Sequence, residues 1–433
     1  MAAQDQGRNG TGAESEFAAL VGVDWADQKL DICLMPCDEK GQREKGVIEH
    51  RPEALADWMA SLRQRFGGRK VAIALEQSKG PLIWALMHHE FVVLYPIHPQ
   101  SLVNFRKAFA PSQAKDDPTD AELALELLAK HRDRLRPWKP DDVRTRTLGL
   151  LAQARRQAVD LRTELSNKLT ACLKGYFPQA LEWAGETIHS PMACDFLRQW
   201  PTLQDLQRTP AHKIRKFYIA CGCRRPDVIE ERLQAIPKAV ALTQDPAILE
   251  SSVLTVRMLA RQLRDLGDAI REYEQRLDQL FNDHPDAPIF SSFPGAADAL
   301  RPRLAAAFGS DRDRYQAAED LQTFSGIAPV TERSGKSHWV HWRWACPKFL
   351  RQTFQEFAFH SMKTCGWARA YYDQMIAKGK DHHAAVRALA FKWIRILFRC
   401  WKDRQPYDES RYLAALQKRG SPLHALLANG GQT

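Results

Sequence analysis

The sequence has no run of apolar residues long enough to cross a membrane. A spanning helix needs about 20 consecutive apolar residues, and no stretch of the 433 residues comes close to that length. Residues Met1 to Glu14 are polar and contain no apolar signal core. We therefore expect no membrane partner, a disordered tail over residues 1–16 and a cytoplasmic location.

Paired cysteine motifs and a nucleotide-binding loop are also missing. The nine cysteines are an odd number, are scattered along the chain and include no pair of CxxC units. This pattern argues against a disulfide framework and against a zinc site. The phosphate-binding pattern GxxxxGK[ST] does not occur either, so the chemistry has to proceed without an ATP motif.

Basic residues are abundant, and their excess belongs to the C-terminal segment. The formal net charge is +10, and from Glu332 to the end 18 Lys and Arg stand against 7 Asp and Glu. A basic segment interleaved with Trp, Tyr and Phe favours a polyanionic partner, most simply nucleic acid. A solvated surface is the alternative explanation of the same pattern.

The first 140 residues alternate strand-like and helical patterns, which predicts a layered α/β domain. Ala18 to Met35 contains two strand patterns, and the apolar run Leu20 to Val23 ends at Asp24. A second buried run, Val71 to Leu75, ends at Glu76, and a third covers Phe91 to Tyr95. Helical spacing is found at Ala54 to Phe66 and Leu82 to His89.

Four acidic residues in this region form a candidate metal site. Asp24 and Glu76 each end a strand, and ligands gather outside such strand ends in open α/β sheets. Asp117 and Asp120 are three residues apart at the start of a helix, so they share one face. Each acid alone is also typical of a turn or a helix cap. Together they favour a site for Mg²⁺, with two ions possible for an in-line attack on phosphate.

The middle of the chain is helical. Asp141 to Tyr176 and Ser251 to Phe281 carry apolar residues at steps of three and four over several heptads, as in a coiled coil. Two such helices predict an antiparallel pair or a dimerisation stalk, and packing inside a single helical domain is an equal alternative.

The C-terminal part carries a second place for chemistry, Arg333-Ser334-Gly335-Lys336. A serine on a glycine turn between cations is suited to attack a phosphodiester and to form a phosphoserine link, although such a segment is commonly only a turn. The run His338 to Trp344 reads as a strand crowded with aromatic and cationic side chains. It predicts either a core strand or a base-stacking platform, leaving open which of Trp339, His341, Trp342 and Arg343 contact nucleic acid.

Six motifs in order resemble one family, the DEDD-type transposases of the insertion-sequence one-ten family. The N-terminal motifs are Val21-Gly22-Val23-Asp24, Leu75-Glu76-Gln77-Ser78-Lys79-Gly80 and Lys115-Asp116-Asp117-Pro118-Thr119-Asp120-Ala121. The C-terminal motifs are Phe293-Pro294-Gly295, Gly326-Ile327-Ala328-Pro329 and Arg333-Ser334-Gly335-Lys336. The likeness extends over roughly residues 18–130 and 290–400.

The resemblance implies a fold class of α/β plus α. A RuvC-like, RNase H-type domain over 17–140 would hold Mg²⁺ at Asp24, Glu76, Asp117 and Asp120. A helical or coiled-coil region over 141–285 would lead to a mostly helical transposase domain over 286–402 and a tail over 403–433. Lys115, Arg333, Lys336 and Arg343 are the expected nucleic-acid contacts.

The same resemblance implies the activity and the partners. The enzyme would be an RNA-guided transposase that cuts and rejoins donor and target DNA, with Ser334 as the nucleophile and a structured noncoding RNA choosing the sites. Acidic cluster and serine would meet across protomers in a dimer that assembles to a tetramer. Asp116 stands where the family commonly has Thr or Ser, so it competes with its neighbour as a ligand, and Ser337 is a second candidate nucleophile.

Two other functions fit parts of the sequence. A hydrolytic RuvC-like endonuclease, such as a Holliday-junction or structure-specific nuclease, would use the acids with water and leave Ser334 as a turn residue. A nucleic-acid-binding protein with a dead acidic site would use neither. Loss of Asp24 separates the first two functions from the third, and Ser334→Ala separates recombination from hydrolysis.

Overall fold

The computed structural model describes residues 16–38, 42–76, 80–109, 117–335 and 337–430. The chain forms two compact units, Met1–Pro140 and Asp141–Thr433, and each is described by itself. The finer domain boundaries predicted from the sequence stay predictions. No helix among the described residues is long and apolar enough to span a membrane, and none of the nine cysteines forms a disulfide.

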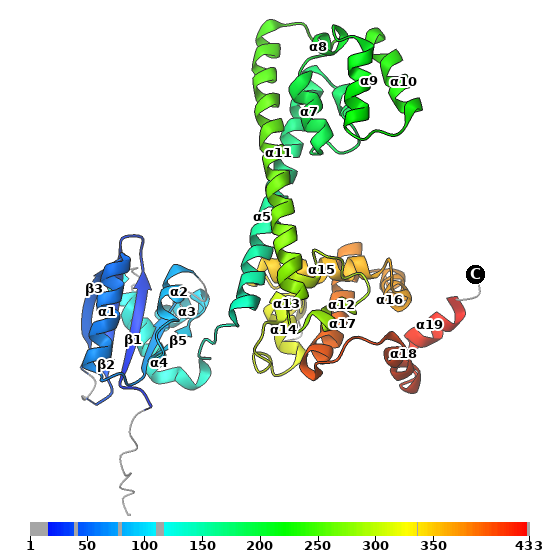
Figure 1. Ribbon diagram of the computed structural model, residues 1–433. Coiled ribbons are helices and arrows are strands. Elements are labelled where there is room, and N and C mark those ends of the chain that lie inside the picture. The colour runs from blue at the N-terminus through cyan, green and yellow to red at the C-terminus, as the bar shows by residue number, and fades with distance from the viewer. Residues whose placement is uncertain (1–15, 39–41, 77–79, 110–116, 336, 431–433) are drawn as a thin grey trace, which may run out of the picture. The chain divides into compact units, whose positions relative to one another are not determined.

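The N-terminal unit is built on a five-stranded sheet, which confirms the expected α/β class of this region (Figure 1). The strands are β1 (Ala19–Trp25), β2 (Lys29–Pro36), β3 (Glu44–Glu49), β4 (Val71–Leu75) and β5 (Val92–Pro96). Their order is β3-β2-β1-β4-β5, with β1, β2 and β3 antiparallel and β1, β4 and β5 parallel.

Helices cover both faces of this sheet. They are α1 (Pro52–Arg65), α2 (Pro81–Leu86), α3 (Pro99–Phe109) and α4 (Asp117–His131), and a 3₁₀ turn follows at Arg132–Arg134. Because successive side chains of a strand point to opposite faces, Val21 and Ile73 pack with α1 and α2, whereas Leu20 and Ala72 pack with α3 and α4. The sheet is thus the middle of three layers.

Two long helices, α5 (Val143–Tyr176) and α11 (Pro246–Asn282), form the arm of the second unit. The start of α5 shares a core with the end of α11, through Leu148 and Leu277. The end of α5 shares another core with the first half of α11, through Leu169 and Val256. The two helices are therefore antiparallel within one chain (Figure 1).

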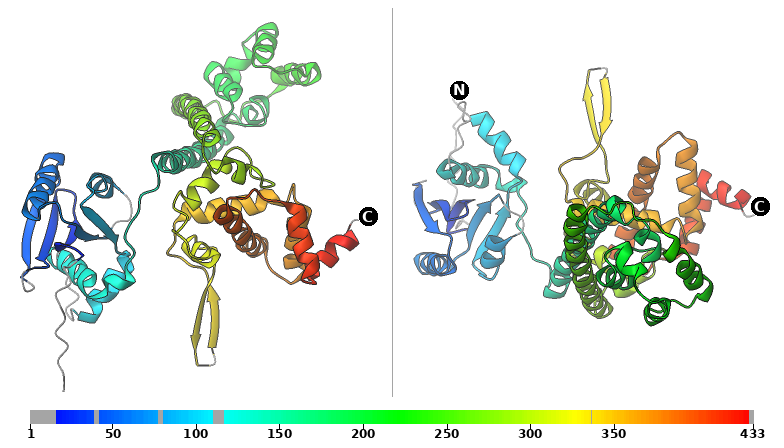
Figure 2. Two further views of the ribbon diagram at one scale, coloured as in Figure 1. Left: turned by 60° about the horizontal axis from the view of Figure 1, so that its bottom comes forward. Right: turned by 90° about the horizontal axis from the view of Figure 1, so that it is seen from above.

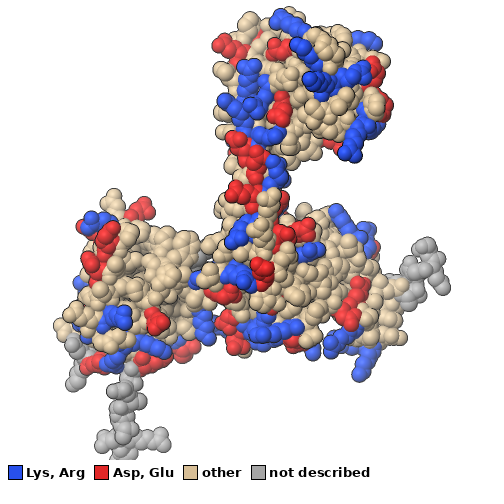
Figure 3. Space-filling model, viewed as in Figure 1, with Lys and Arg blue, Asp and Glu red and all other residues tan. Residues whose placement is uncertain are grey.

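A helical head lies at the far end of this arm and has its own core, rich in aromatic residues such as Trp183, Phe196 and Trp200. Its helices are α6 (Ala180–Trp183), α7 (Pro191–Gln199), α8 (Leu203–Gln207), α9 (Ala211–Ala220) and α10 (Pro226–Ala235), followed by a 3₁₀ turn at Ile236–Lys238. On the face shown in Figure 3, basic and acidic side chains are interspersed over this head.

The C-terminal body packs around the buried side chains of Trp367, Trp393 and Trp401. Its elements are α12 (Ala287–Ser291), α13 (Arg301–Phe308), α14 (Ala318–Phe324), β6 (Val330–Ser334), β7 (Ser337–His341), α15 (Lys348–Ser361), α16 (Gly366–Ala377), α17 (His382–Asp403), α18 (Glu409–Lys418) and α19 (Pro422–Gly430).

The expected C-terminal tail, residues 403–433, is instead largely helical. Arg404 adopts a left-handed conformation at φ 55° and ends α17. The chain then turns into α18 and α19, where Leu416 and Leu423 are buried in the core of the C-terminal body. The sequence carried a sign of this packing, because leucines recur at steps of three and four at Leu413, Leu416, Leu423, Leu426 and Leu427.

Candidate functional site

Two of the four predicted acids meet at one edge of the sheet. In the parallel pair of β1 and β4, Val23 lies opposite Leu75, so the next residues, Asp24 and Glu76, are neighbours in register. Leu20 and Ala72 point toward the face of the sheet that α4 covers. Asp24 and Glu76 each lie four positions further along the same strand direction, so their side chains point to that face as well. The side chains therefore leave the sheet on one side at the carboxyl ends of two adjacent strands.

Asp24 and Glu76 line the same pocket. It has a volume of about 270 Å³ and is also lined by Val23, Trp25, Leu75, Leu82 and Pro99. Glu76 is exposed and Asp24 is half-buried. Parallel strands thus bring together two carboxylates that are 52 positions apart in the sequence, and they do so in a hollow that a phosphate group can enter.

The helix that carries the other two acids starts next to this edge. A Cβ atom on Gly22 would lie 2.5 Å from the backbone nitrogen of Leu125 and even closer to the carbonyl oxygen of Ala121. Only a glycine in β1 allows α4 to approach so closely. The contact fixes the first turn of α4 beside Asp24, two residues further along β1.

Asp120 lies in that first turn, but its carboxylate already has a partner. It is buried and forms an ion pair with Arg106 of α3, whose side chain is only 13% exposed. Asp120 does not line the pocket shared by Asp24 and Glu76. Asp117 begins α4, and its side chain is not among those described, like all of Lys115 and Asp116.

The described side chains therefore form half of the predicted metal site. No group of three or more histidine, cysteine, aspartate or glutamate residues among them is placed to hold a metal ion. The two carboxylates in the pocket are the kind of hard oxygen ligand that Mg²⁺ prefers, and Mg²⁺ is usually bound by one or two carboxylates plus water and phosphate oxygens. The donor set that is described fits such an ion.

Sequence reasoning missed two residues of this region. Asp31 of β2 lies directly opposite Asp24 of β1, is buried and pairs with Lys29 at 2.9 Å. Directly opposite side chains on a sheet are close neighbours, so Asp31 adds a third acid to the surroundings of Asp24. The alternating apolar pattern at Leu30 and Ile32 indicated a strand that contains Asp31. Nothing in the sequence indicated the pairing of Arg106 with Asp120.

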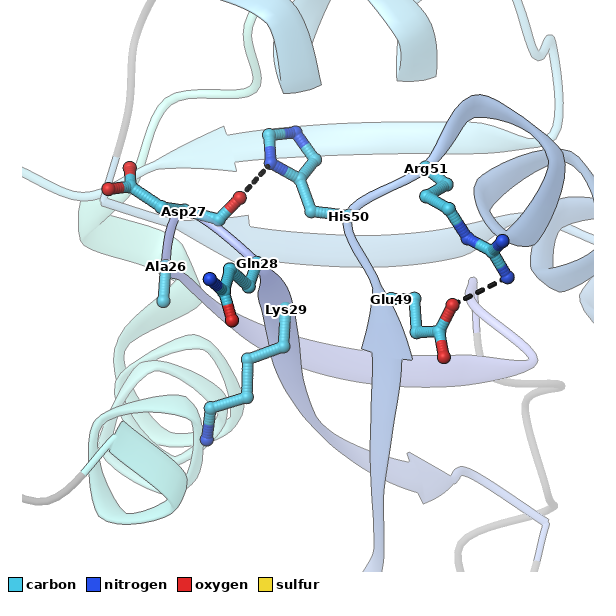
Figure 4. Close-up of a pocket in the computed structure, with 7 residues that line it drawn as sticks. All are labelled: Ala26, Asp27, Gln28, Lys29, Glu49, His50 and Arg51. Atoms are coloured by element: carbon cyan, nitrogen blue, oxygen red, sulfur yellow. Dashed lines mark hydrogen bonds and ion pairs between the residues drawn. The ribbon is translucent and has the colours of Figure 1, made fainter.

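A second, wider hollow lies at the turn after β1 and contains none of the predicted site residues (Figure 4). It has a volume of about 790 Å³ and is lined by Ala26, Asp27, Gln28, Lys29, Glu49, His50 and Arg51. The His50 ring bonds to the Asp27 carbonyl at 3.0 Å, and Arg51 pairs with Glu49 at 2.5 Å. Lys29, another of its charged residues, pairs with Asp31 of β2.

The predicted serine lies at the end of a two-stranded hairpin that extends from the C-terminal body (Figure 2). β6 and β7 are antiparallel, Ser334 is the last residue of β6 and lies opposite Ser337, and Gly335 follows at φ 55°. Ser334 is exposed. Lys336 lies outside the described residues.

The hairpin places Arg333 and Ser334 on opposite faces. The pairs alternate between faces, so Ser334 and Ser337 share a face with Glu332 and Trp339, while Arg333 and His338 lie on the other. Arg343 follows β7, and its Nε is buried without a hydrogen-bond partner among the described residues. Arg333, one of the two cations beside the serine in sequence, therefore lies across the plane of the hairpin from Ser334.

Comparisons with known proteins point to one group. Residues 21–178 match a family model described as "Transposase", of the DEDD type of IS110. Residues 287–373 match the "Transposase IS116/IS110/IS902 family" model. The first match contains all four predicted acids, the second contains Ser334, and together they cover more than half of the chain.

Three relatives show how far the similarity extends. A mini-circle putative transposase for IS117 from Streptomyces coelicolor is 27% identical over 93% of this chain and 98% of its own length. An uncharacterized 42 kDa protein of insertion element IS900 from Mycobacterium paratuberculosis is 25% identical over 91% of this chain and 98% of its own length. A pilin gene-inverting protein from Moraxella bovis is 25% identical over 34% of this chain and 48% of its own length.

Proposed function

This chain belongs to the IS110 family of transposases, and on that premise we propose that it cuts and rejoins DNA with an acidic metal site and a serine nucleophile. As a transposase it is an enzyme that rearranges DNA. The observation that carries the proposed mechanism is the shared pocket of Asp24 and Glu76.

The N-terminal unit is proposed to have a RuvC-like, RNase H-type fold. Support comes from the mixed sheet, whose central strand β1 has antiparallel neighbours on one side and parallel ones on the other. Its acids lie at the carboxyl ends of β1 and β4, where ligands of open α/β sheets bind.

Asp24, Glu76, Asp117 and Asp120 are proposed to hold Mg²⁺, with room for a second ion. Asp24 and Glu76 contribute from the sheet edge, and α4 contributes from the turn that Gly22 brings close. When bound, the metal neutralises charge that builds up on the phosphate during displacement. Asp120 joins such a site by exchanging the guanidinium of Arg106 for the cation.

Ser334 is proposed to be the nucleophile, with Ser337 as the second candidate. Its oxygen forms a bond to phosphorus while one bond from phosphorus to a deoxyribose oxygen breaks, and that oxygen takes up a proton from solvent and leaves as a hydroxyl group. The serine proton passes to solvent. Attack of a new deoxyribose hydroxyl on the phosphoserine rejoins the strand and frees the serine, so no ATP is consumed.

Basic residues are proposed to hold the DNA and RNA backbones. Lys115, Arg333, Lys336 and Arg343 flank the acidic and serine sites in sequence, and cations bind phosphates without regard to base sequence. A structured noncoding RNA would then choose donor and target by base pairing, as in other RNA-guided systems. The working assembly would be a dimer that pairs into a tetramer.

A denaturing gel of protein attached to labelled DNA tests the mechanism. The reaction contains Mg²⁺, DNA of the element and the RNA encoded beside the gene. Wild type should yield a covalent adduct, and both Ser334→Ala and Asp24→Asn should abolish it. Cleaved DNA without any adduct, unchanged by Ser334→Ala, would instead establish a hydrolytic nuclease, and DNA binding without cleavage would establish a dead site.

A further inference from the structure

One face of the β6–β7 hairpin carries a tryptophan beside the serine. The pairs Glu332–Trp339 and Ser334–Ser337 are successive on this face, and His341 follows opposite Val330. We call Glu332, Trp339 and His341 the aromatic face of the hairpin. Successive rows on a face are about 7 Å apart, a distance that a single nucleotide spans.

Trp339 is far more exposed than a structural tryptophan. It is 61% exposed, although a large aromatic side chain usually gains from burial. Trp342, three residues later, shows the contrast, because the guanidinium of Arg387 lies 3.7 Å and that of Arg351 lies 5.5 Å from its ring centroid. Trp342 is thus covered by the chain itself, whereas Trp339 presents its ring to whatever binds the hairpin.

The ring of His341 is fixed against Trp339. The two centroids are 4.4 Å apart with an angle of 33° between the planes. The Nδ1 of His341 donates to the carbonyl oxygen of Trp342, and its Nε2 donates to the carboxylate of Glu332, each at 2.8 Å. Both partners are acceptors, so they favour the doubly protonated ring: the hydrogen bonds to Glu332 and to the Trp342 carbonyl raise the pKa of His341 above its ordinary value of 6.5. The stacked imidazole orients the indole of Trp339 before any ligand arrives.

We propose that the aromatic face binds an unpaired base of the DNA strand that Ser334 attacks, by stacking on Trp339. This inference rests on the proposed role of Ser334. Stacking on an aromatic ring accepts any base, because every base has a π-face. It requires the base to be out of the double helix, which is the state of nucleotides next to a strand being exchanged. Stacking there would hold the scissile phosphate one nucleotide away, beside the serine.

Photochemical crosslinking tests this site without any need for catalysis. The probe is a single-stranded thymidine dodecamer with one 5-iododeoxyuridine, mixed with the full-length protein. A crosslink at Trp339, mapped by mass spectrometry, is expected in wild type and also in Ser334→Ala. Crosslinks that map only to other residues would overturn the proposal.

Binding of the same dodecamer gives the size of the effect. Trp339→Ala should weaken binding about 5- to 150-fold, and Trp339→Phe should retain most of it. Val340→Ala is the matched control, since Val340 is 49% exposed on the opposite face of the same hairpin, and it should bind like wild type. Equal binding by Trp339→Ala and wild type, or a clear preference for an RNA dodecamer, would contradict the assignment to DNA.

The two proposals fail in different ways. If wild type gives the Trp339 crosslink but no covalent adduct with DNA of the element, the aromatic face stands and the role of Ser334 falls. If the adduct forms through Ser334 but Trp339→Ala binds and reacts like wild type, the nucleophile stands and the aromatic face falls.

Discussion

Gly22 controls how closely the acid-bearing helix approaches the sheet. Its missing side chain leaves room for the backbone of α4 at Ala121 and Leu125. Backbone atoms cannot rotate away as the end of a side chain can, so any side chain at this position has to push the helix. The first turn of α4, with Asp120, would move away from Asp24.

Gly22→Ala is expected to destabilise the N-terminal unit by about 1–3 kcal/mol, the usual cost of overpacking. Thermal unfolding followed by circular dichroism measures this. Gly267→Ala is the control, because a Cβ there meets nothing within 4 Å in the long helix α11. It should instead stabilise by about 0.5–1 kcal/mol. Equal stability of Gly22→Ala and wild type would mean that α4 is not fixed by this contact.

His284 ties the end of α11 to the start of α5, because it follows α11 and bonds to Thr145 of α5. Asp286 donates its backbone N–H to Nδ1 at 3.1 Å, so the proton is on Nε2, which donates to Thr145 Oγ1 at 2.9 Å. Thr145 in turn donates to the carboxylate of Asp142 at 2.7 Å. The chain of bonds requires a neutral ring.

The stability of the arm should therefore fall in mild acid. Burial lowers the pKa of His284 below its ordinary value of 6.5, and the nearby cations Arg144 and Arg312 lower it further. The carboxylates of Asp286 and Asp142 raise the pKa, but they do not outweigh the effect of burial. At a pH below 6.5 the His284 ring takes up a proton in the unfolded chain but resists it in the folded chain. The contribution of His284 to the free energy of unfolding is therefore complete above pH 6.5 and is lost as the pH falls toward the pKa of the folded state.

Urea unfolding at about pH 8 and about pH 5.5 measures this loss, which should be on the order of 1 kcal/mol. His284→Gln carries no titrating ring and should show a smaller difference between the two pH values than wild type. If both proteins lose the same stability, His284 is not responsible.

Single residues of the site were predictable where the strand pattern fixes them. Asp24 and Glu76 follow apolar runs, so their place at the strand ends follows from the sequence. Asp31 and Arg106 were missed because their roles depend on which strand lies opposite and which helix packs alongside. These relations join residues that are distant in the chain, and local patterns do not contain them.

At the scale of elements, the ion pair between Arg106 and Asp120 links α3 to α4. Both side chains are largely buried, and removing one partner of such a pair leaves an uncompensated charge. Arg106→Leu should therefore destabilise by about 3–5 kcal/mol, while Arg106→Leu combined with Asp120→Leu should recover most of the loss. Chemical unfolding with urea measures both.

Magnesium gives this test a second readout. If Asp120 is a ligand, magnesium chloride should recover part of the stability of Arg106→Leu, because the cation replaces the guanidinium as partner of the carboxylate. Arg69→Leu is the matched control, since its pair with Asp38 is exposed, and it should cost less than about 1 kcal/mol. A loss in Arg106→Leu no larger than this control would rule out a stabilising role for the pair.

Most elements were predictable from apolar periodicity, and the exceptions have physical reasons. β4 was expected at Val71 to Leu75 and lies there, and α5 and α11 lie within a few residues of their expected bounds. β3 was missed because it is an edge strand with the polar sequence EKGVIE. α3 was missed although it carries apolar residues, and it packs against the sheet through Leu102, with Phe105 partly buried beside it.

At the scale of the whole molecule, acidic site and serine belong to separate units of the chain, Met1–Pro140 and Asp141–Thr433. If they meet across protomers, a mixture of two inactive variants should regain activity. Ser334→Ala supplies the acidic site, and Asp24→Asn supplies the serine. The mixture should form the covalent adduct, although neither variant does so alone. No adduct at any ratio would favour a site completed within one chain.

The antiparallel arm also has a topological consequence. The chain enters the helical head through α5 and returns through α11, so both connections leave the C-terminal body at one place. The head has a separate core, and the connectivity of the body does not depend on it. In topological terms the head is an excursion of the chain, and a tight turn between α5 and α11 in its place would preserve the order of the remaining elements.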